Sequence, residues 1–222
     1  MKKNFSRLYK GVYGRDRGQN WGERMRSTID LNYILPPVQV TKKTNNATKE
    51  ANKRMSMGQA IAEARQGMTQ AELAEKLHLD RTSVGKYETG KRRVPEHMRA
   101  TIASTLDDPV VYFAAEEEAT GGVTIPYLNG ERIERSLSAM KELARYEALE
   151  ALEHLDRVRF HKPPEYWTEE EKAEVQQVMY ELLDAAASIQ NLVAVSCKDY
   201  GFSPKKIYKE WRNTVKKRGW MK

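Results

Sequence analysis

Apolar positions recur at helical spacing along most of the chain, so the sequence predicts an all-α protein. Between residues 57 and 115 they form short stretches separated by turn residues, a pattern typical of a small helical domain. Two longer stretches follow, whereas the start of the chain lacks any sustained apolar period. We therefore expect a mostly flexible basic extension (1–54), a compact helical domain (55–118), a linker or small hairpin (119–130) and a separate helical domain (131–222).

Each of the two long stretches carries an apolar stripe. The first, with a period near 3.5 residues, consists of Leu137, Met140, Ala144, Ala148, Ala151, Leu155 and Val158. The second consists of Val175, Met179, Leu182, Ala186, Ile189 and Val193. The first stripe suits close helix pairing, either as a coiled-coil-like dimer interface or as the core of a three-helix bundle within one chain. In the bundle, a last helix beginning at Ser203 and Pro204 would place Trp211 in the core.

The segment between residues 69 and 93 predicts two short helices that cross sharply. Thr69 can cap the first helix, and Asp80 can cap the second in the same way. Few residues separate the helices, so they must turn abruptly, with small Ala74 where they touch and Val84 packing from the second helix. This arrangement is a helix-turn-helix, whose second helix is free to enter a DNA major groove.

At these residues the chain resembles the phage repressor and Cro family of helix-turn-helix regulators, also called the xenobiotic-response-element (XRE) family. The resemblance covers residues 57–115 and rests on the spacing of Thr69-Gln70, Ala74, Val84, Tyr87-Glu88 and Gly90-Lys91. It implies five helices near 57–65, 69–77, 81–88, 95–105 and 108–117. His78 stands at a turn position that the family usually fills with glycine, so we expect a left-handed backbone there.

The resemblance also implies which side chains meet DNA. The recognition helix, 81–88, would present four base-contacting residues: Arg81, Thr82, Ser83 and Lys86. Their chemistry is suitable, because Arg and Lys bind guanine edges and Thr or Ser can contact several bases. The residues expected to contact phosphates are Gln70, Tyr87, Lys91, Arg92 and Arg93. Tyr87 would be a half-buried support with its hydroxyl near a phosphate, and Arg65 and Glu88 would form a structural salt bridge.

Charge is distributed unevenly along the chain, whose total is +7. Residues 1–54 hold 13 Lys+Arg and 4 Asp+Glu, residues 107–197 hold 8 and 19, and residues 198–222 hold 9 and 2. Basic ends around an acidic centre favour a polyanionic partner, and nucleic acid more than a membrane surface. The apolar runs are too short to span a bilayer, so we expect a cytoplasmic protein. The family resemblance implies a bacterial or prophage origin.

The remaining motifs are weaker. The basic amino-terminal segment interleaves aromatic residues, which suits a minor-groove arm or single-strand binding, although an unstructured extension, or a true start at Met55 or Met57, is favoured. A short helix is expected over Trp21 to Ile29. Cys197, Gly201 and Ile207 echo the spacing of a second helix-turn-helix. No phosphate loop, metal-ligand spacing or nucleophile motif occurs, so we expect neither enzyme activity nor a metal or cofactor.

The sequence thus predicts a double-stranded-DNA-binding transcriptional regulator, a prophage-type repressor that occupies an operator as a homodimer. A protein partner or an effector could act on its carboxy-terminal domain. The alternative is a protein-interaction adaptor, antitoxin or antirepressor-like, that acts through residues 131–222.

Overall fold

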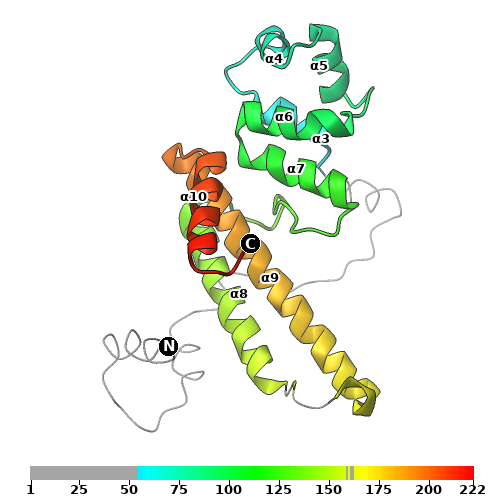
Figure 1. Cartoon of the computed structure of the whole chain (residues 1–222), viewed down its shortest axis with the longest axis vertical. Helices are drawn as coiled ribbons and strands as arrows, with labels where there is room; N and C mark the ends of the chain where they lie inside the picture. The colour runs from blue at the N-terminus through cyan, green and yellow to red at the C-terminus, as the bar shows by residue number, and fades with distance from the viewer. Residues whose placement is uncertain (1–54, 159, 161–162) are drawn as a thin grey trace. The chain divides into compact units, whose positions relative to one another are not determined.

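The computed structural model describes residues 55–158, 160 and 163–222 (Figure 1). Five short helices come first: α3 (Met57–Ala64), α4 (Gln70–Leu77), α5 (Arg81–Glu88), α6 (Glu96–Leu106) and α7 (Pro109–Thr120). Three more follow: α8 (Leu137–Arg157), α9 (Glu169–Tyr200) and α10 (Pro204–Lys217). A short 3-10 turn, η2 (Pro164–Tyr166), precedes α9.

The described residues contain no β-strand, which confirms the predicted all-α class. The same observation shows that the hairpin considered for 119–130 was wrong, since α7 continues to Thr120 and the residues after it form no ladder. The helix expected over Trp21 to Ile29 lies outside the described residues, as does the rest of the basic extension.

The five short helices enclose one apolar core. Each helix contributes from one face, and the most deeply buried side chains include Met57, Ile61, Leu73, Val84, Ile102 and Val111. The helices begin at caps that satisfy their first amides: Ser56 with Gln59 for α3, and Thr69 with Glu72 for α4. The helix boundaries lie within a few residues of those implied by the resemblance.

The segment between α7 and α8, residues 121–136, is attached to α9 through Asn191. The Asn191 side chain, which is fully buried, accepts a hydrogen bond from the Leu128 amide at 2.9 Å and donates one to the Pro126 carbonyl at 2.9 Å. The Tyr127 ring contacts Phe113 of α7, with 5.5 Å between centroids, and the Arg135 guanidinium lies 3.9 Å from the Tyr127 centroid. One buried amide therefore holds this segment in place.

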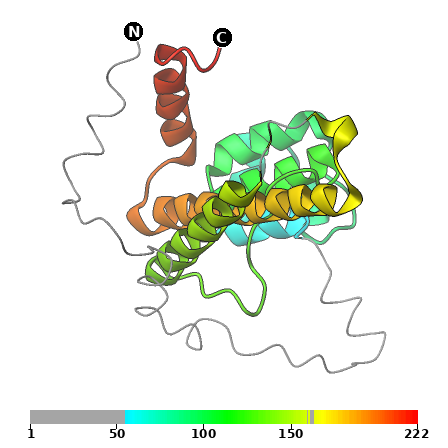
Figure 2. The ribbon, with the colours of Figure 1, turned by 90° about the horizontal axis from the view of Figure 1, so that it is seen from below.

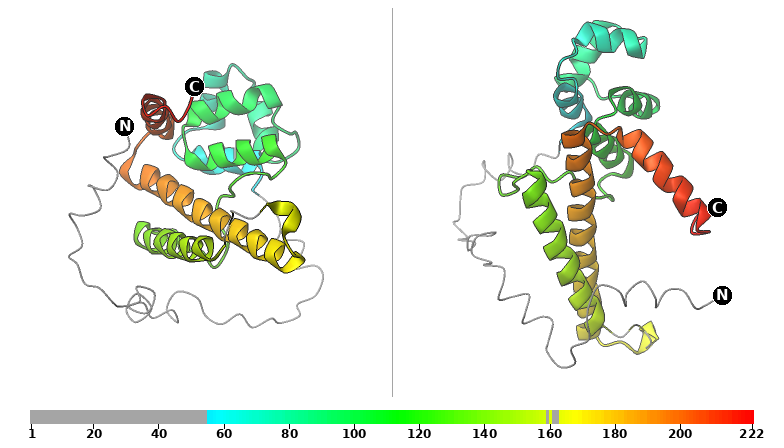
Figure 3. Two further views of the ribbon diagram at one scale, coloured as in Figure 1. Left: turned by 60° about the horizontal axis from the view of Figure 1, so that its bottom comes forward. Right: turned by 90° about the vertical axis from the view of Figure 1, so that its left-hand side faces the viewer.

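Helices α8 and α9 form an antiparallel hairpin, visible in both views of Figure 3. The first predicted stripe is confirmed as its core, because Met140, Ala144 and Ala151 are buried. The second was wrong as the core of the pair. Val178 and Ala185 are buried instead, together with other α9 residues, whereas the predicted positions Met179, Leu182 and Ile189 are 55%, 41% and 46% exposed.

The reason is that α9 carries two apolar faces. A repeat of about 3.5 residues identifies a face that can pair with another helix. Both apolar faces of α9 have such spacing, so the spacing does not show which one pairs with α8. Only the approach of α8 decides which of them is covered. The heptad-spaced face beginning at Val175 is left largely open and is called the α9 stripe below: Val175, Met179, Leu182, Ala186 and Ile189.

Helix α10 does not complete a three-helix bundle. It turns away from α8 and α9 (Figure 2), and Trp211 is 56% exposed, so its predicted place in a bundle core was wrong. Gly201 ends α9 in a left-handed conformation, as the sequence indicates. Ser203 caps α10, whose first residue is Pro204. The Asp107 carboxylate at the end of α6 accepts hydrogen bonds from the Ser203 hydroxyl and the Lys205 amide, and thereby fixes the start of α10.

The echo of a second helix-turn-helix is local. The Phe202 amide donates to the Cys197 carbonyl at 2.8 Å, as the Leu79 amide donates to the Ala74 carbonyl at 2.9 Å. Cys197 is buried, as expected for a small packing residue. Ile207 is 37% exposed, however, so α10 does not pack on α9 as a recognition helix packs on its partner. None of the described helices is long and apolar enough to cross a membrane.

Candidate nucleic-acid interface

The α4 helix begins at a reciprocal cap. The Thr69 amide donates to the Glu72 carboxylate at 2.6 Å, and the Glu72 amide donates to the Thr69 hydroxyl at 3.2 Å. The bond from the Thr69 amide, followed by that from its hydroxyl, lowers the pKa of Glu72. The carboxylate therefore stays charged at the positive end of α4 and holds the helix start in one geometry.

The turn between α4 and α5 adopts the expected left-handed form at His78, with φ 53° and ψ 44°. Ala74 and Val84 are both buried where the two helices cross. Asp80 occupies the predicted cap position of α5 with an extended backbone. Its side chain makes no capping hydrogen bond, so that part of the prediction was wrong. Burial of Val84 against α4, rather than a carboxylate cap, holds α5 in place.

Glu88, at the end of α5, joins three helices. Its carboxylate accepts from the Arg65 Nε at 2.6 Å, which confirms the predicted structural salt bridge, and from the Gln70 Nε2 at 2.6 Å. Arg65 also donates to the Met68 carbonyl. The Glu88 side chain is only 7% exposed, so these charge-assisted bonds operate largely away from water and fix α5 relative to α3 and α4.

A glycine provides a second fixed point, which sequence reasoning missed. Gly58 lies on α3 against the end of α5, and a Cβ at this position would come within 2.0 Å of the Tyr87 carbonyl oxygen. Glycine inside a predicted helix is the signal that could have found it, because such a residue often marks a close backbone approach.

The structure keeps the predicted base-contacting side chains together on α5. Arg81, Thr82 and Lys86 are exposed, and Ser83 is partly exposed. Val84 and Tyr87 on the same helix are buried, so the polar residues share the face that does not meet the core. This face is called the recognition face below.

The predicted phosphate contacts lie around this face. Lys91, Arg92 and Arg93 are exposed in the segment that follows α5. Tyr87 was expected to be half-buried, but it is only 4% exposed; its ring belongs to the core, with the Arg92 guanidinium 5.9 Å from its centroid. The Gln70 side-chain amide donates to Glu88. A phosphate could therefore contact Gln70 through its backbone N–H, which lies at the start of α4.

Two short helices that cross at small buried side chains around a left-handed turn, with a polar outer face on the second, define a helix-turn-helix DNA-binding domain. A family model described as helix-turn-helix matches residues 61–107, which supports the resemblance to the XRE-type regulators. The match covers the centre of the domain and less than a quarter of the chain. Neither a curated protein nor a solved structure matches the chain significantly.

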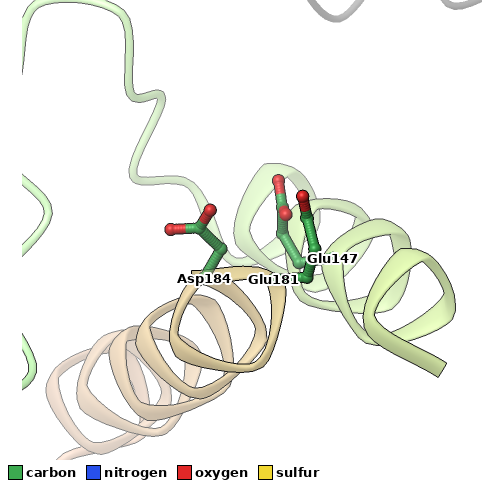
Figure 4. Close-up of side chains that lie close together, drawn as sticks. All are labelled: Glu147, Glu181 and Asp184. Atoms are coloured by element: carbon green, nitrogen blue, oxygen red, sulfur yellow. The ribbon is translucent and has the colours of Figure 1, made fainter. Parts of the chain in front are cut away.

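A group of acidic side chains lies away from this interface, on the α8–α9 hairpin. Glu147 of α8 and Glu181 and Asp184 of α9 each bring a carboxylate oxygen within 4.8 Å of the other two (Figure 4). Burial, and then the charges of Asp184, Glu150 and Glu181, raise the pKa of Glu147 to about 7. Three such oxygens can hold a hard cation, but exposed acidic groups often gather without one.

Proposed function

We propose that the protein is a sequence-specific double-stranded-DNA-binding transcriptional regulator, a repressor of the prophage type that occupies an operator. The observation that carries the proposal is the recognition face, which holds Arg81, Thr82 and Lys86 exposed on a helix anchored through Glu88. Side chains on such a face can reach base edges only if the helix is held in one orientation. The hydrogen bonds from Arg65 and Gln70 to the buried Glu88 carboxylate supply that restraint.

The proposal divides the interface into two kinds of contact. Arg81 and Lys86 bind guanine edges, and Thr82 and Ser83 contact neighbouring bases, so these residues specify the sequence. The phosphates are bound by the backbone amide of Gln70 and by Lys91, Arg92 and Arg93, and these contacts set the docking position. The Tyr87 ring packs under the Arg92 guanidinium and supports it. Base contacts should therefore control specificity, and the phosphate contacts should control the overall affinity and its salt dependence.

Selection of fragmented bacterial genomic DNA at about 150 mM salt tests the proposal. The wild-type protein should enrich a common site, and Arg81→Ala/Thr82→Ala should lose that preference, with specific affinity about ten-fold or more weaker. Lys91→Ala/Arg93→Ala should instead weaken binding to all sequences and reduce the salt slope.

The matched control is Ser138→Ala/Lys141→Ala, which removes one hydroxyl and one cation from exposed positions on α8. This variant should select the same site as the wild type. Even recovery of all fragments by the wild-type protein, or an unchanged site with Arg81→Ala/Thr82→Ala, would show that the recognition face does not read DNA.

The proposal includes a homodimer. A domain with one short recognition helix contacts few base pairs, and two such domains on adjacent half-sites bind much more tightly. The α9 stripe is a suitable interface, because Met179, Leu182, Ala186 and Ile189 follow heptad spacing and remain exposed after α8 has packed. Pairing of two α8–α9 hairpins through this stripe would form a four-helix bundle.

The adaptor alternative, and a dimer as well, cannot use the stripe that contains Leu137, Met140 and Leu155 as it stands, because Met140 is fully buried within the hairpin. An adaptor would have to use the exposed α9 stripe instead. A measurement of the oligomeric state would therefore separate the two functions.

A further inference from the structure

A groove lies between the outer side of the helix-turn-helix domain and the last two helices. It is bordered by α6 and α7 on one side and by α9 and α10 on the other, and its volume is about 920 Å³. This volume is within the range of protein sites that bind small molecules, which run from roughly 300 to 1,000 Å³. The recognition face of α5 contributes no residue to the groove.

Aromatic and small apolar side chains form the walls. Tyr112 and Phe113 line the groove from α7, and Tyr208 and Trp211 line it from α10. Tyr208 and Trp211 meet edge to face, with 6.1 Å between their centroids. Trp211 nevertheless keeps more than half of its surface exposed, so the protein's own packing does not fill this site. A planar apolar molecule would cover surface that is now in water.

The groove is electropositive. Its cationic lining residues are Arg99, Lys205, Lys209, Arg212 and Lys216, whereas only two lining residues are acidic, Glu96 and Glu116. No ion pair joins the four α10 cations to another side chain in the described part of the chain. Arg99 is paired with Glu118 at 3.3 Å through Nη2, but its Nε is buried without a hydrogen-bond partner among the described residues.

The basic wall is held in position by one carboxylate. Asp107 accepts hydrogen bonds from the Tyr112 hydroxyl at 3.0 Å and from the Lys205 amide at 3.1 Å, and also from the Ser203 hydroxyl. Burial and the bond to Asp107 raise the pKa of Tyr112. Asp107 thus ties α7 to α10 at one end of the groove, so that the aromatic and cationic side chains face a common space before any ligand binds.

We propose that this groove binds a small aromatic acid, with its ring against Trp211 and Tyr208 and its anionic group near Lys209 and Arg212. The ligand's charge complements the unpaired cations, and its ring matches the aromatic walls. The basic amino-terminal segment is not a suitable occupant, since its 13 Lys+Arg against 4 Asp+Glu would be repelled. This inference concerns ligand binding and does not rest on DNA recognition.

Fluorescence titration of the full-length protein tests the inference with anilinonaphthalene sulfonate, an aromatic anion that brightens in apolar sites. We expect saturable binding of one probe per chain, and clearly weaker binding of the neutral analogue phenylnaphthylamine. Lys209→Gln/Arg212→Gln should weaken binding of the anion about ten-fold and leave the neutral analogue nearly unchanged.

A second pair of variants checks the location without removing charge. Ala100→Trp places a large side chain in the groove from an exposed position on α6, and Ala173→Trp makes the same change at an exposed position on α9 outside it. Only Ala100→Trp should reduce probe binding, and circular dichroism should show that both variants are folded.

Three results would overturn the inference: unchanged probe binding with Ala100→Trp, equal affinity for the neutral analogue, and loss of the probe only when the α9 stripe is mutated. Selection of DNA by the recognition face is measured separately, so failure of either proposal leaves the other standing.

Discussion

At the residue scale, the orientation of the recognition helix depends on a glycine, which has no side chain to keep two backbones apart. Gly58 allows the backbone of α3 to approach the carbonyl of Tyr87, one residue before Glu88. The buried carboxylate of Glu88 then joins Arg65 and Gln70 across the same junction. The exposed residues that would read DNA are therefore positioned by atoms that DNA itself does not contact.

Gly58→Ala should destabilise the domain. Alanine is the better helix former by about 1 kcal/mol, but its Cβ would lie 2.0 Å from a backbone oxygen that no rotamer change can move. We expect a net loss of about 1–3 kcal/mol in the free energy of unfolding, measured by urea denaturation. Gly130→Ala is the matched control, because a Cβ there meets no atom within 4 Å. Equal stabilities of the two variants would contradict the close approach.

At the element scale, the α8–α9 hairpin brings like charges together. Glu147 packs against α9 beside Glu181 and Asp184, and burial with these charges disfavours its ionised form. The pKa of Asp184 is also raised, by burial and by Glu181. An acidic cluster that binds a proton more tightly in the folded chain than in the unfolded chain couples the stability of the hairpin to pH.

The sign follows from the raised pKa of Glu147. The folded chain binds this proton more tightly than the unfolded chain, so the contribution to stability is complete below pH 4.5 and is lost as pH rises through about 7. Glu147→Gln should flatten this dependence and stabilise the protein at pH 8, by about 1 kcal/mol after allowance for its partial exposure. Urea unfolding at pH 5 and pH 8 measures both effects.

Glu174→Gln removes a carboxylate from an exposed position of α9 outside the cluster and serves as the control. It should retain the wild-type dependence on pH. If Glu147→Gln also retains that dependence, Glu147 is not the group that titrates.

Helix positions were predictable in this region, but their packing was not. Thr168, Gly201 and Ser203 mark the ends of α9 and α10 as the sequence indicates, because caps and left-handed turns depend on a few neighbouring residues. Val178 is buried and Met179 is exposed, although both belong to apolar faces of one helix. That difference depends on where α8 lies, which spacing within α9 does not determine.

At the scale of the whole molecule, the α9 stripe leads to a prediction about assembly. Met179→Glu/Leu182→Glu places charges at two exposed stripe positions without altering the buried face of α9. Sedimentation equilibrium should give a dimer for the wild type and a monomer for this variant, because burying unpaired carboxylates in an interface is costly. The variant should remain folded and lose affinity for the paired half-sites about ten-fold or more.

Lys172→Glu/Gln176→Glu introduces the same two carboxylates at exposed polar positions of α9 and should remain dimeric. A wild-type protein that is monomeric at concentrations of about 10 μM would contradict the proposed interface. In that event the stripe would be assigned to a different protein partner, as the adaptor alternative requires.

The two crossing helices and their caps could be predicted from spacing along the chain, and the family resemblance added the left-handed turn at His78 and the set of side chains on α5, because each of these features depends on short-range order. The packing of distant elements could be learned from the folded chain alone: which face of α9 is covered, that α10 borders a groove on the domain, and that Asn191 holds Leu128 across 63 positions of the chain. Burial is set by elements far apart in sequence, and no local pattern records which of two suitable apolar faces its neighbour will cover.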